Sequence, residues 1–289
     1  MRRVLAAASV FLACSLVAQN VPRQSAAGME FVKIAPGEFM LGCSIGDIDC
    51  NDDERPIHRV QVGEFYIGRF PVTHDEYARF VNATGYPFPV IHKLPLVAST
   101  GRDTEFRELA APYVWDHSGP PSGRGGHPVV LIRHSDALAY CRWMSRVLDR
   151  TVRLPTEAEW EKAARGGVEG QRHPWGDGEP DATRCNFLAD PSQKSRRGTR
   201  PTGTYPPNAY GLYDIAGNVW EWVSDWYEAD YYGAGVSQDP TGPETGEMRI
   251  VRGGSWVSDD PSMLRCAYRH QVPPDTYTYS IGFRIVCEA

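Results

Sequence analysis

The segment LPTEAEWEKAARGG, residues 154–167, gives the clearest local structural signal in the chain. Thr156 is of the residue type that caps helix N-termini, and Glu159, three residues later, completes a capping-box pattern. Gly166 and Gly167 follow the helical stretch, where glycine commonly ends a helix. The segment therefore predicts a short helix with defined ends.

Alternating and amphipathic patterns surround this helix in the sequence. Residues 29–42 alternate apolar and polar side chains around a Pro-Gly turn and predict a hairpin, and residues 58–73 predict two short strands. Residues 74–85 and 135–148 have the periodicity of amphipathic helices. Residues 87–126 are irregular and rich in proline and glycine, which is typical of a long loop that lines a site.

The composition indicates one large, loop-rich domain. The chain has 289 residues, and no Pro/Ser linker or change of periodicity divides it into two cores. Its 28 glycines, 23 prolines and 11% aromatic residues favour turns and irregular segments held by aromatic packing. We therefore expect a loop-rich α+β fold.

The first residues have the pattern of an export signal. Arg2 and Arg3 precede the apolar run 4–17, which is too short to span a membrane, and a cleavage junction follows Ala18. We therefore expect a periplasmic or secreted protein without a transmembrane segment. A buried N-terminal helix is one alternative interpretation, and a lipid anchor on Cys14 is another.

These features divide the chain into a signal peptide (1–18), a linker (19–28) and one domain (29–289). Removal of the signal peptide takes away two arginines and changes the formal net charge from −6 to −8. This acidic balance argues against nucleic acid as the partner. We expect a monomer whose partner is a peptide, a small molecule or a protein.

Cysteine usage agrees with export. The chain has seven cysteines, and removal of Cys14 with the signal peptide leaves six, at spacings unlike those of CxxC metal sites. Cys43 and Cys50 bracket a short Gly/Asp loop, which makes them natural partners for a local disulfide. Six buried free thiols are the alternative.

Five blocks of sequence resemble one known family in their order and approximate spacing. The blocks are residues 154–167, 173–180, 206–227, 249–256 and 280–286. Together they resemble the sulfatase-modifying, formylglycine-generating enzyme family over Met29 to Val286. The resemblance implies the loop-rich formylglycine-generating-enzyme variant of the C-type lectin fold, with a few helices and small antiparallel sheets.

The resemblance also implies an active site after the Gly-Gly-Ser-Trp block at residues 253–256. Formylglycine-generating enzymes oxidise a cysteine of a sulfatase, using two cysteines of this region that hold copper. In this chain Ser258 stands at the first cysteine position, and Ser262 or Met263 stands at the second. A serine hydroxyl is neither a soft Cu(I) ligand nor a redox-active thiolate. We therefore expect neither copper nor formylglycine-generating activity.

Two long-range disulfides are implied by the resemblance. It pairs Cys141 with Cys287 of the last strand, and it leaves Cys185 as the partner of Cys266. The mature chain is therefore expected to contain three disulfides, of which only the local one is suggested by the residues themselves.

The family places one structural calcium ion in the stretch YDIAGNVWEW, residues 213–222. Calcium takes several oxygen ligands, and a Gly-Asn turn lets backbone carbonyls converge between two acids. A tight turn without an ion is the alternative. The implied ligands are the side chains of Asp214 and Glu221 and the carbonyls of Gly217 and Val219.

Other metal sites are not expected. At the second calcium site of the family Asn186 and Phe187 match, but Lys194 stands where an acid belongs and Pro71 replaces a glutamate. No HExxH motif or close histidine pair is present, and the acid run at residues 52–54 is typical of a solvated loop.

Polar residues after the Gly-Gly-Ser-Trp block are the candidates for a remaining pocket, although the catalytic residues stay unassigned. Arg269 has an alternative role as an anchor of the C-terminal strand, and His58, His127 and His270 are interpreted as ordinary polar or core-edge residues. The pocket candidates are Ser258, Asp259, Asp260, Arg265, Tyr268, Arg269 and His270.

Three classes of function fit these observations, and the fold does not decide among them. The first is a divergent, oxidoreductase-like periplasmic modifying enzyme, similar to pyoverdine-tailoring relatives and not a sulfatase activator. The second is a ligand-binding protein of the type that diversity-generating retroelements vary. The third is a structural component of the cell envelope. The first class is the main hypothesis.

Overall fold

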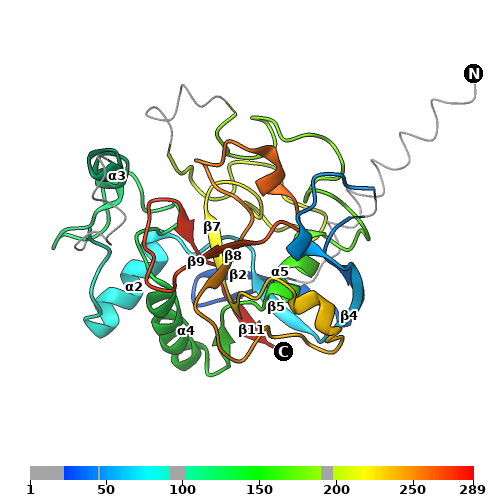
Figure 1. Cartoon of the computed structure of the whole chain (residues 1–289). Coiled ribbons are helices and arrows are strands. Elements are labelled where there is room, and N and C mark those ends of the chain that lie inside the picture. Colours follow the sequence, from blue (N-terminus) through cyan, green and yellow to red (C-terminus); the bar gives the residue numbers. More distant parts are fainter. Residues whose placement is uncertain (1–22, 45, 92–101, 190–197) are drawn as a thin grey trace, which may run out of the picture.

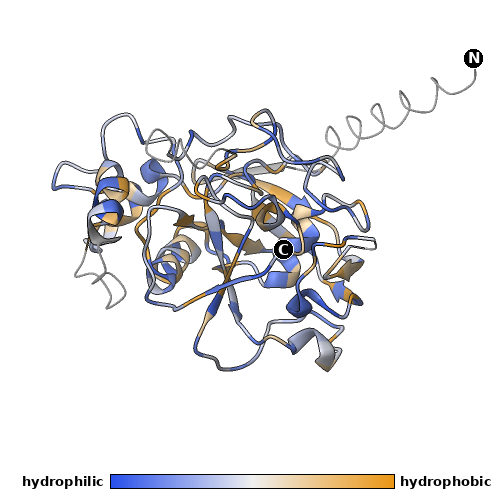
Figure 2. Cartoon of the chain, turned by 45° about the horizontal axis from the view of Figure 1, so that its top comes forward, coloured by the Kyte–Doolittle hydropathy of each residue, from blue (hydrophilic) through white to orange (hydrophobic). Residues whose placement is uncertain are grey.

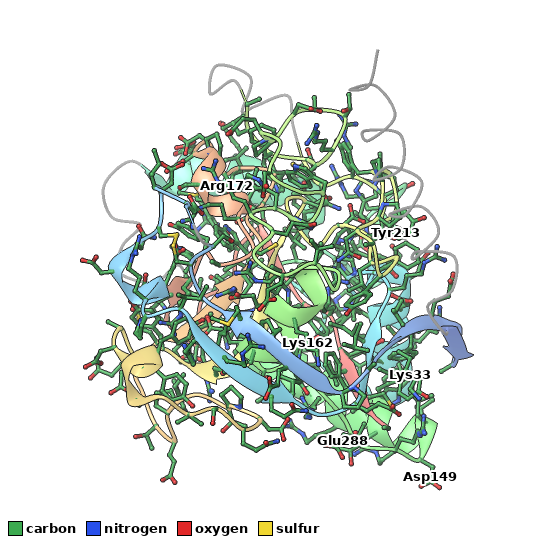
Figure 3. The ribbon with its side chains drawn as sticks, turned by 90° about the vertical axis from the view of Figure 1, so that its right-hand side faces the viewer. Lys33, Asp149, Lys162, Arg172, Tyr213 and Glu288 are labelled. Atoms are coloured by element: carbon green, nitrogen blue, oxygen red, sulfur yellow. A yellow bond between two sulfur atoms is a disulfide. The ribbon has the colours of Figure 1, made fainter. Side chains whose placement is uncertain are left out.

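The helix predicted after Thr156 is formed as α5 (Glu157–Ala164), and all eight of its residues are buried. Thr156 Oγ1 accepts a hydrogen bond from the Glu159 amide at 3.2 Å, and the Glu159 carboxylate accepts one from the Thr156 amide at 2.8 Å. The predicted capping box is therefore confirmed. The Lys162 ammonium donates to the carbonyls of Ala35 and Gly37, both at 2.9 Å, and so joins α5 to the start of strand β3 (Gly37–Leu41) (Figure 3).

The described residues are 23–44, 46–91, 102–189 and 198–289 of a computed structural model (Figure 1). The expected signal peptide, residues 1–18, lies outside them. Part of the expected linker, residues 19–28, forms strand β1 (Arg23–Ala26), so the folded part begins before residue 29. Within the described residues, no helix is long and apolar enough to cross a bilayer.

One sheet of five antiparallel strands joins the two ends of the described chain. Its order is β1-β2-β5-β11-β6. The C-terminal strand pairs with β5 on one side and with β6 on the other, so the last residues lie inside the sheet (Figure 1). Its strands besides β1 are β2 (Met29–Ile34), β5 (Phe65–Gly68), β11 (Val286–Glu288) and β6 (Val152–Arg153).

Two smaller sheets complete the strand structure of the described residues. One has the order β10-β7-β8-β9, with β10 (Ile281–Gly282) parallel to β7 (Trp220–Trp226) and β8 (Arg249–Arg252) antiparallel to its neighbours. Its edge strand β9 is His270–Val272. The other sheet pairs β3 (Gly37–Leu41) with β4 (His58–Val62).

The hairpin predicted for residues 29–42 is wrong. Strands β2 and β3 are consecutive across Pro36, but β2 pairs with β5 and β3 pairs with β4. Alternation identifies a strand, whereas the partner of a strand depends on distant residues. The two strands predicted within residues 58–73 are confirmed as β4 and β5.

The two predicted amphipathic helices are confirmed as α2 (His74–Thr84) and α4 (His134–Leu148). A capping box at Thr73 begins α2, and Gly85, with φ of 70°, ends it. Residues 87–126, expected to be a loop, also contain α3 (Arg102–Ala110), which lies to one side of the body in Figure 1. The short 3-10 helices are η1 (Asp52–Glu54), η3 (Ala111–Tyr113), η5 (Tyr231–Ala234) and η6 (Pro261–Leu264).

Apolar side chains gather in the interior, where Figure 2 shows the central strands as mainly hydrophobic. One cluster joins α2 and α4 through Tyr77 and Tyr140, whose stacked rings are 5.8 Å apart. A second cluster packs Trp160 of α5 against Ile67 and Val286 of the five-stranded sheet. The core therefore lies between the helices and the sheets.

Two buried carboxylates of α5 are neutralised by three arginines, two from the C-terminal part of the chain and one at the C-cap of the helix itself. Arg252 donates to Glu157 at 2.7 Å and to Glu161 at 2.6 Å. Arg269 contacts Glu157 at 2.9 Å, and Arg165 contacts Glu161 at 2.8 Å. The side chains in these pairs are at most 4% exposed. This cluster, the α5 charge cluster, fixes the C-terminal segment against the helix.

We predict that Glu157→Gln strongly destabilises the protein. The change leaves Arg252 and Arg269 partly unpaired in the interior, and breaking a buried ion pair costs about 3–5 kcal/mol. Urea unfolding measures the loss. The matched control is Glu179→Gln, because Glu179 is 71% exposed and its pair with Arg172 is worth less than about 1 kcal/mol. Equal stabilities of the two variants would contradict the role of the cluster.

Candidate functional site

The Gly-Gly-Ser-Trp block forms a tight turn directly after β8. Gly253 has φ of 93°, and a Cβ there would lie 2.8 Å from the Ile215 carbonyl oxygen. Gly254 has φ of 72°, and a Cβ there would lie 2.7 Å from Leu264. Both positions need glycine for conformation and for close packing. The block is therefore explained by the fold, whatever the chemistry of the residues that follow.

Ser258 is buried, with 3% exposure, and its hydroxyl completes this turn. Its Oγ accepts a hydrogen bond from the Ser255 amide at 3.0 Å, and its amide donates to the Ser255 carbonyl at 3.0 Å. The Ser258 carbonyl accepts from the Leu188 amide at 2.9 Å. Ser258, which stands at the expected first cysteine position, therefore has a structural role, because its hydroxyl is hydrogen-bonded to the Ser255 amide.

Arg265 and Arg269 do not line a pocket, which corrects the sequence interpretation. Arg265 is 1% exposed and forms two hydrogen bonds with Glu54, at 2.6 and 2.7 Å. Arg269 is 4% exposed and binds Glu157 in the α5 charge cluster. The pair between Arg269 and Glu157 supports the alternative that Arg269 anchors the C-terminal strand. Glu54 belongs to the acid run interpreted as solvated, and its burial corrects that interpretation too.

Two of the partly exposed pocket candidates, Tyr268 and His270, have rings that lie against the buried Trp220. The His270 ring stacks on Trp220 at 5.0 Å and an interplanar angle of 28°, and the Tyr268 ring lies 5.9 Å from Trp220. Burial lowers the pKa of His270, so its imidazole is neutral near pH 7. Asp259 and Asp260 are exposed nearby in the sequence, and Asp260 caps η6 through the Ser262 amide. A neutral imidazole on an aromatic surface can accept a proton or a hydrogen bond.

The local disulfide is confirmed between Cys43 and Cys50. The two expected long-range disulfides, Cys141–Cys287 and Cys185–Cys266, are not formed. All four of these cysteines are buried free thiols. The members of the second pair lie in different apolar clusters, Cys185 beside Phe187 and Cys266 beside the α5 core. Burial raises the pKa of Cys141, Cys185 and Cys266 to about 12, so these thiols stay protonated.

The loop expected to bind calcium contains two buried acids, Asp214 and Glu221, which have different partners. Both Glu221 oxygens bind Arg284, at 2.6 and 2.7 Å, and one of them also accepts from the Trp160 indole at 2.7 Å. Asp214 accepts from the Gly203 amide at 2.7 Å. Burial and the Glu221 charge raise the pKa of Asp214 to about 6, although hydrogen bonds and Arg284 oppose the shift.

The donor set therefore fits a cation at Asp214 better than at Glu221. Asp214 and Asn218 have φ of 52° and 65°, and Gly217 between them has φ of 76°, so the chain turns sharply here. A cavity of about 50 Å³ is lined in part by Asp214, Trp175 and Pro206. Glu221 brings a charge that Arg284 already compensates.

Of the residues that correspond to the family's second calcium site, which is expected to hold no ion here, Lys194 lies outside the described residues. Asn186 donates its side-chain amide to the Gly198 carbonyl at 3.0 Å and to the Asn218 side chain at 3.3 Å. Asn186 thus joins this segment to the loop at residues 213–222. Among the described residues, no group of three or more His, Cys, Asp or Glu side chains is placed to hold a metal ion.

Sequence reasoning missed the acids that the fold uses most. Glu157, Glu161 and Asp225 are buried, and the Glu157 amide donates to Asp225 at 2.9 Å. Burial and the charge of Glu157 raise the pKa of Asp225 to about 7. The only feature of the sequence that could have indicated their burial was the apolar residues next to these acids. The largest of three prominent cavities, about 480 Å³, lies among Arg153, Glu159 and other polar residues, and no pocket candidate lines any of the three.

Comparisons with known proteins cover nearly the whole chain. The family described as sulfatase-modifying factor enzyme 1-like domain matches residues 17–289. A formylglycine-generating enzyme of Streptomyces coelicolor is 36% identical over 287 residues, covering 89% of this chain and 89% of that protein. The Bos taurus protein named inactive C-alpha-formylglycine-generating enzyme 2 is 32% identical over 285 residues, covering 89% of this chain and 87% of that protein.

A solved structure agrees with these matches. PvdO from Pseudomonas aeruginosa superimposes with a TM-score of 0.72 and 28% identity. The match covers 90% of this chain and 95% of the PvdO chain. The similarity therefore extends over the whole fold and is not confined to the five sequence blocks.

We predict that Ser258→Ala destabilises the protein by about 1–3 kcal/mol, because the buried Ser255 amide loses its acceptor. Thermal and urea unfolding measure the change. Ser262→Ala is the matched control, since Ser262 lies four residues away and is partly exposed. If Ser258→Ala is as stable as the control, the Ser258 hydroxyl does not hold the turn.

Proposed function

Because this chain belongs to the family of sulfatase-modifying factor enzyme 1-like domains, we propose that it is a divergent modifying enzyme that acts outside the cytosol and does not form formylglycine. Its fold is the loop-rich α+β formylglycine-generating-enzyme variant of the C-type lectin fold. The Cys43–Cys50 disulfide supports an oxidising compartment, as does the export signal expected at residues 1–18.

The observation that carries the proposal is that the Ser258 side chain is a buried hydroxyl with a structural hydrogen bond. At the position that the resemblance assigns to the first copper-binding cysteine, a buried hydroxyl accepts the Ser255 amide. Copper(I) prefers thiolate ligands, and a hydroxyl that is hydrogen-bonded within a turn is a poor ligand for it. The free thiols of the described residues are buried, and burial raises the pKa of each. The bovine relative named inactive is comparably similar to this chain.

A different chemistry is supported by an aromatic surface formed by the partly exposed rings of Tyr268 and His270, which lie against the buried Trp220. The ring faces suit an aromatic or cationic group of a substrate, because aromatic faces attract both. The neutral His270 imidazole is able to take a proton from a group bound there. We assign this surface, which follows the Gly-Gly-Ser-Trp turn, as the substrate side of the protein.

We predict that the mature protein, supplied with copper, leaves a Cys-x-Pro-x-Arg sulfatase peptide unmodified. The expected result is an unchanged peptide mass, whereas the Streptomyces coelicolor enzyme, as the positive control, produces the aldehyde. Detection of formylglycine with this protein would contradict the proposal.

The modifying activity itself is tested in the source organism with a deletion strain. Untargeted mass spectrometry of exported compounds should show a mass difference that the wild-type gene restores and His270→Ala does not. Restoration by His270→Ala would remove the proposed role of His270. An unchanged exported pool in the deletion strain would favour a binding protein over an enzyme.

We also propose one structural calcium ion at Asp214, with the carbonyls of Gly217 and Val219 and a smaller contribution from Glu221. Calcium bound to the folded state alone stabilises it by RT ln(1 + [L]/Kd), about 2.7 kcal/mol at a hundredfold excess over Kd. The ion offsets the cost of keeping the Asp214 carboxylate buried. It takes no part in the proposed reaction.

We predict that chelation lowers the melting temperature and that added calcium restores it, with Asp214→Asn removing both responses. Asp214→Asn is the informative change, because Glu221→Gln also breaks the pair with Arg284. Asp177→Asn, in an exposed turn, serves as the control and should respond like wild type. Identical melting of the wild type with calcium and with chelator would show that the loop is only a turn.

A further inference from the structure

The Cys43–Cys50 disulfide closes a short loop whose two sulfurs have different surroundings. Cys43 is 5% exposed, whereas Cys50 is partly exposed. Ile48, within the loop, is 92% exposed. We propose that this disulfide is redox-active: it undergoes thiol–disulfide exchange with a low-molecular-weight thiol, with Cys50 as the exchanging cysteine and Cys43 as the resolving cysteine. This assignment does not depend on the proposed modifying activity.

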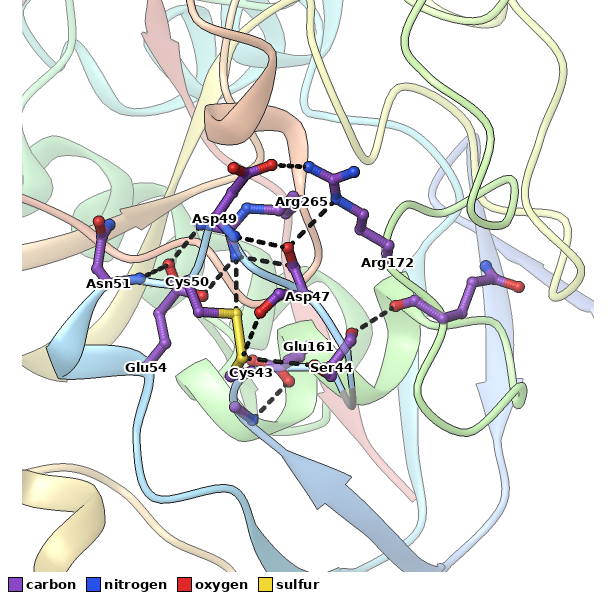
Figure 4. Close-up of a disulfide and its surroundings, with 12 residues drawn as sticks. Cys43, Ser44, Asp47, Asp49, Cys50, Asn51, Glu54, Glu161, Arg172 and Arg265 are labelled. Carbon is purple, nitrogen blue, oxygen red and sulfur yellow. Dashed lines mark hydrogen bonds and ion pairs between the residues drawn. A yellow bond between two sulfur atoms is a disulfide. The ribbon is translucent and has the colours of Figure 1, made fainter.

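A fixed arginine lies beside the accessible sulfur. Arg265 Nη1 is 3.5 Å from Cys50 Sγ (Figure 4). The guanidinium is held in place by its two hydrogen bonds with Glu54, at 2.6 and 2.7 Å. A positive charge next to a cysteine stabilises the thiolate, which is both the nucleophile and the better leaving group in exchange. Cys50 is therefore the sulfur that the protein prepares for exchange.

The buried sulfur has partners suited to a thiol. Cys43 Sγ lies 3.4 Å from the Ser44 carbonyl oxygen and 3.8 Å from the Asp47 carbonyl oxygen. When the disulfide is reduced, the Cys43 thiol can donate to either oxygen. A partly exposed cysteine next to a cation and a buried cysteine near two carbonyl oxygens make an asymmetric pair, so the accessible sulfur is attacked first.

Other charges around the loop are balanced between acids and arginines. Asp47 contacts Arg265 at 3.3 Å and Arg172 at 3.5 Å, and Arg172 also pairs with Asp49. Burial, Arg172 and Arg265 lower the pKa of His173 to about 4, so this neighbour is neutral. The charged groups that face the disulfide are Asp47, Asp49, Glu54, Arg172 and Arg265.

The exchange balances without another oxidant. An external thiolate attacks Cys50 Sγ, the bond to Cys43 breaks, and Cys43 leaves and takes up a proton. A second thiolate attacks the mixed disulfide and releases Cys50 beside Arg265. Two external thiols are thereby oxidised to one disulfide, while the protein disulfide gains two electrons and the two thiol protons. Because the loop joins only residues 43 and 50, the core contacts of the fold persist through the cycle.

The test uses the mature protein equilibrated in glutathione buffers, followed by rapid alkylation and peptide mass spectrometry. We expect the Cys43–Cys50 peptide to be substantially reduced at about a hundredfold excess of reduced over oxidised glutathione, with a melting transition retained. A peptide that stays fully oxidised under these conditions would make the disulfide structural and would overturn the proposal.

The single-cysteine variants test which sulfur exchanges. In Cys43→Ser, Cys50 should react with iodoacetamide at pH 7 at least about tenfold faster than Cys43 does in Cys50→Ser. Asp47→Asn, made in the Cys43→Ser background, should accelerate Cys50 further because it removes an acid from Arg265. Asp52→Asn in the same background is the matched control. Equal rates for the two cysteines, or faster alkylation of Cys43, would overturn the assignment of Cys50.

Discussion

The pairing of Glu157 and Glu161 with buried arginines is the constraint on which most of the fold depends. Taking these charges out of water is expensive, and the cost is offset only while every member has its partner. Arg252 brings β8 to α5, and Arg269 brings the segment before β9 to the same helix. The cluster thus decides where the C-terminal segment lies.

This constraint also limits the chemistry of that segment. Arg265 and Arg269 are held in the interior by Glu54 and Glu157, and the Ser258 hydroxyl is hydrogen-bonded within its own turn. The pocket candidates that remain accessible are Asp259, Asp260, Tyr268 and His270. A family fold can therefore keep its Gly-Gly-Ser-Trp block for packing reasons while the residues after it vary, because both glycines are required by the turn itself.

Sulfur chemistry in this protein is separated by burial. The four free thiols of the described residues are buried, and burial raises the pKa of each, so they stay protonated and behave as small hydrophobic residues. In the Cys43–Cys50 pair, Cys43 is buried and Cys50 is partly exposed among charged groups, with Arg265 connecting Cys50 to the C-terminal segment. One arginine therefore links the loop near the start of the fold to the region after the Gly-Gly-Ser-Trp turn.

The sequence by itself determined the features that depend on neighbours a few residues apart. Such short-range features are the capping boxes of α5 and α2, the amphipathic face of α4 and the disulfide between Cys43 and Cys50. The five sequence blocks identified the fold family. Only the tertiary structure decided the partners of strands β2 and β3, the unpaired state of Cys185 and Cys266, and the roles of the arginines. Arg265 and Glu54 are 211 residues apart in sequence, and no local pattern shows that two such charges will meet in the interior. Long-range partners are chosen by the free energy of burying all the charges together, which the folded chain alone defines.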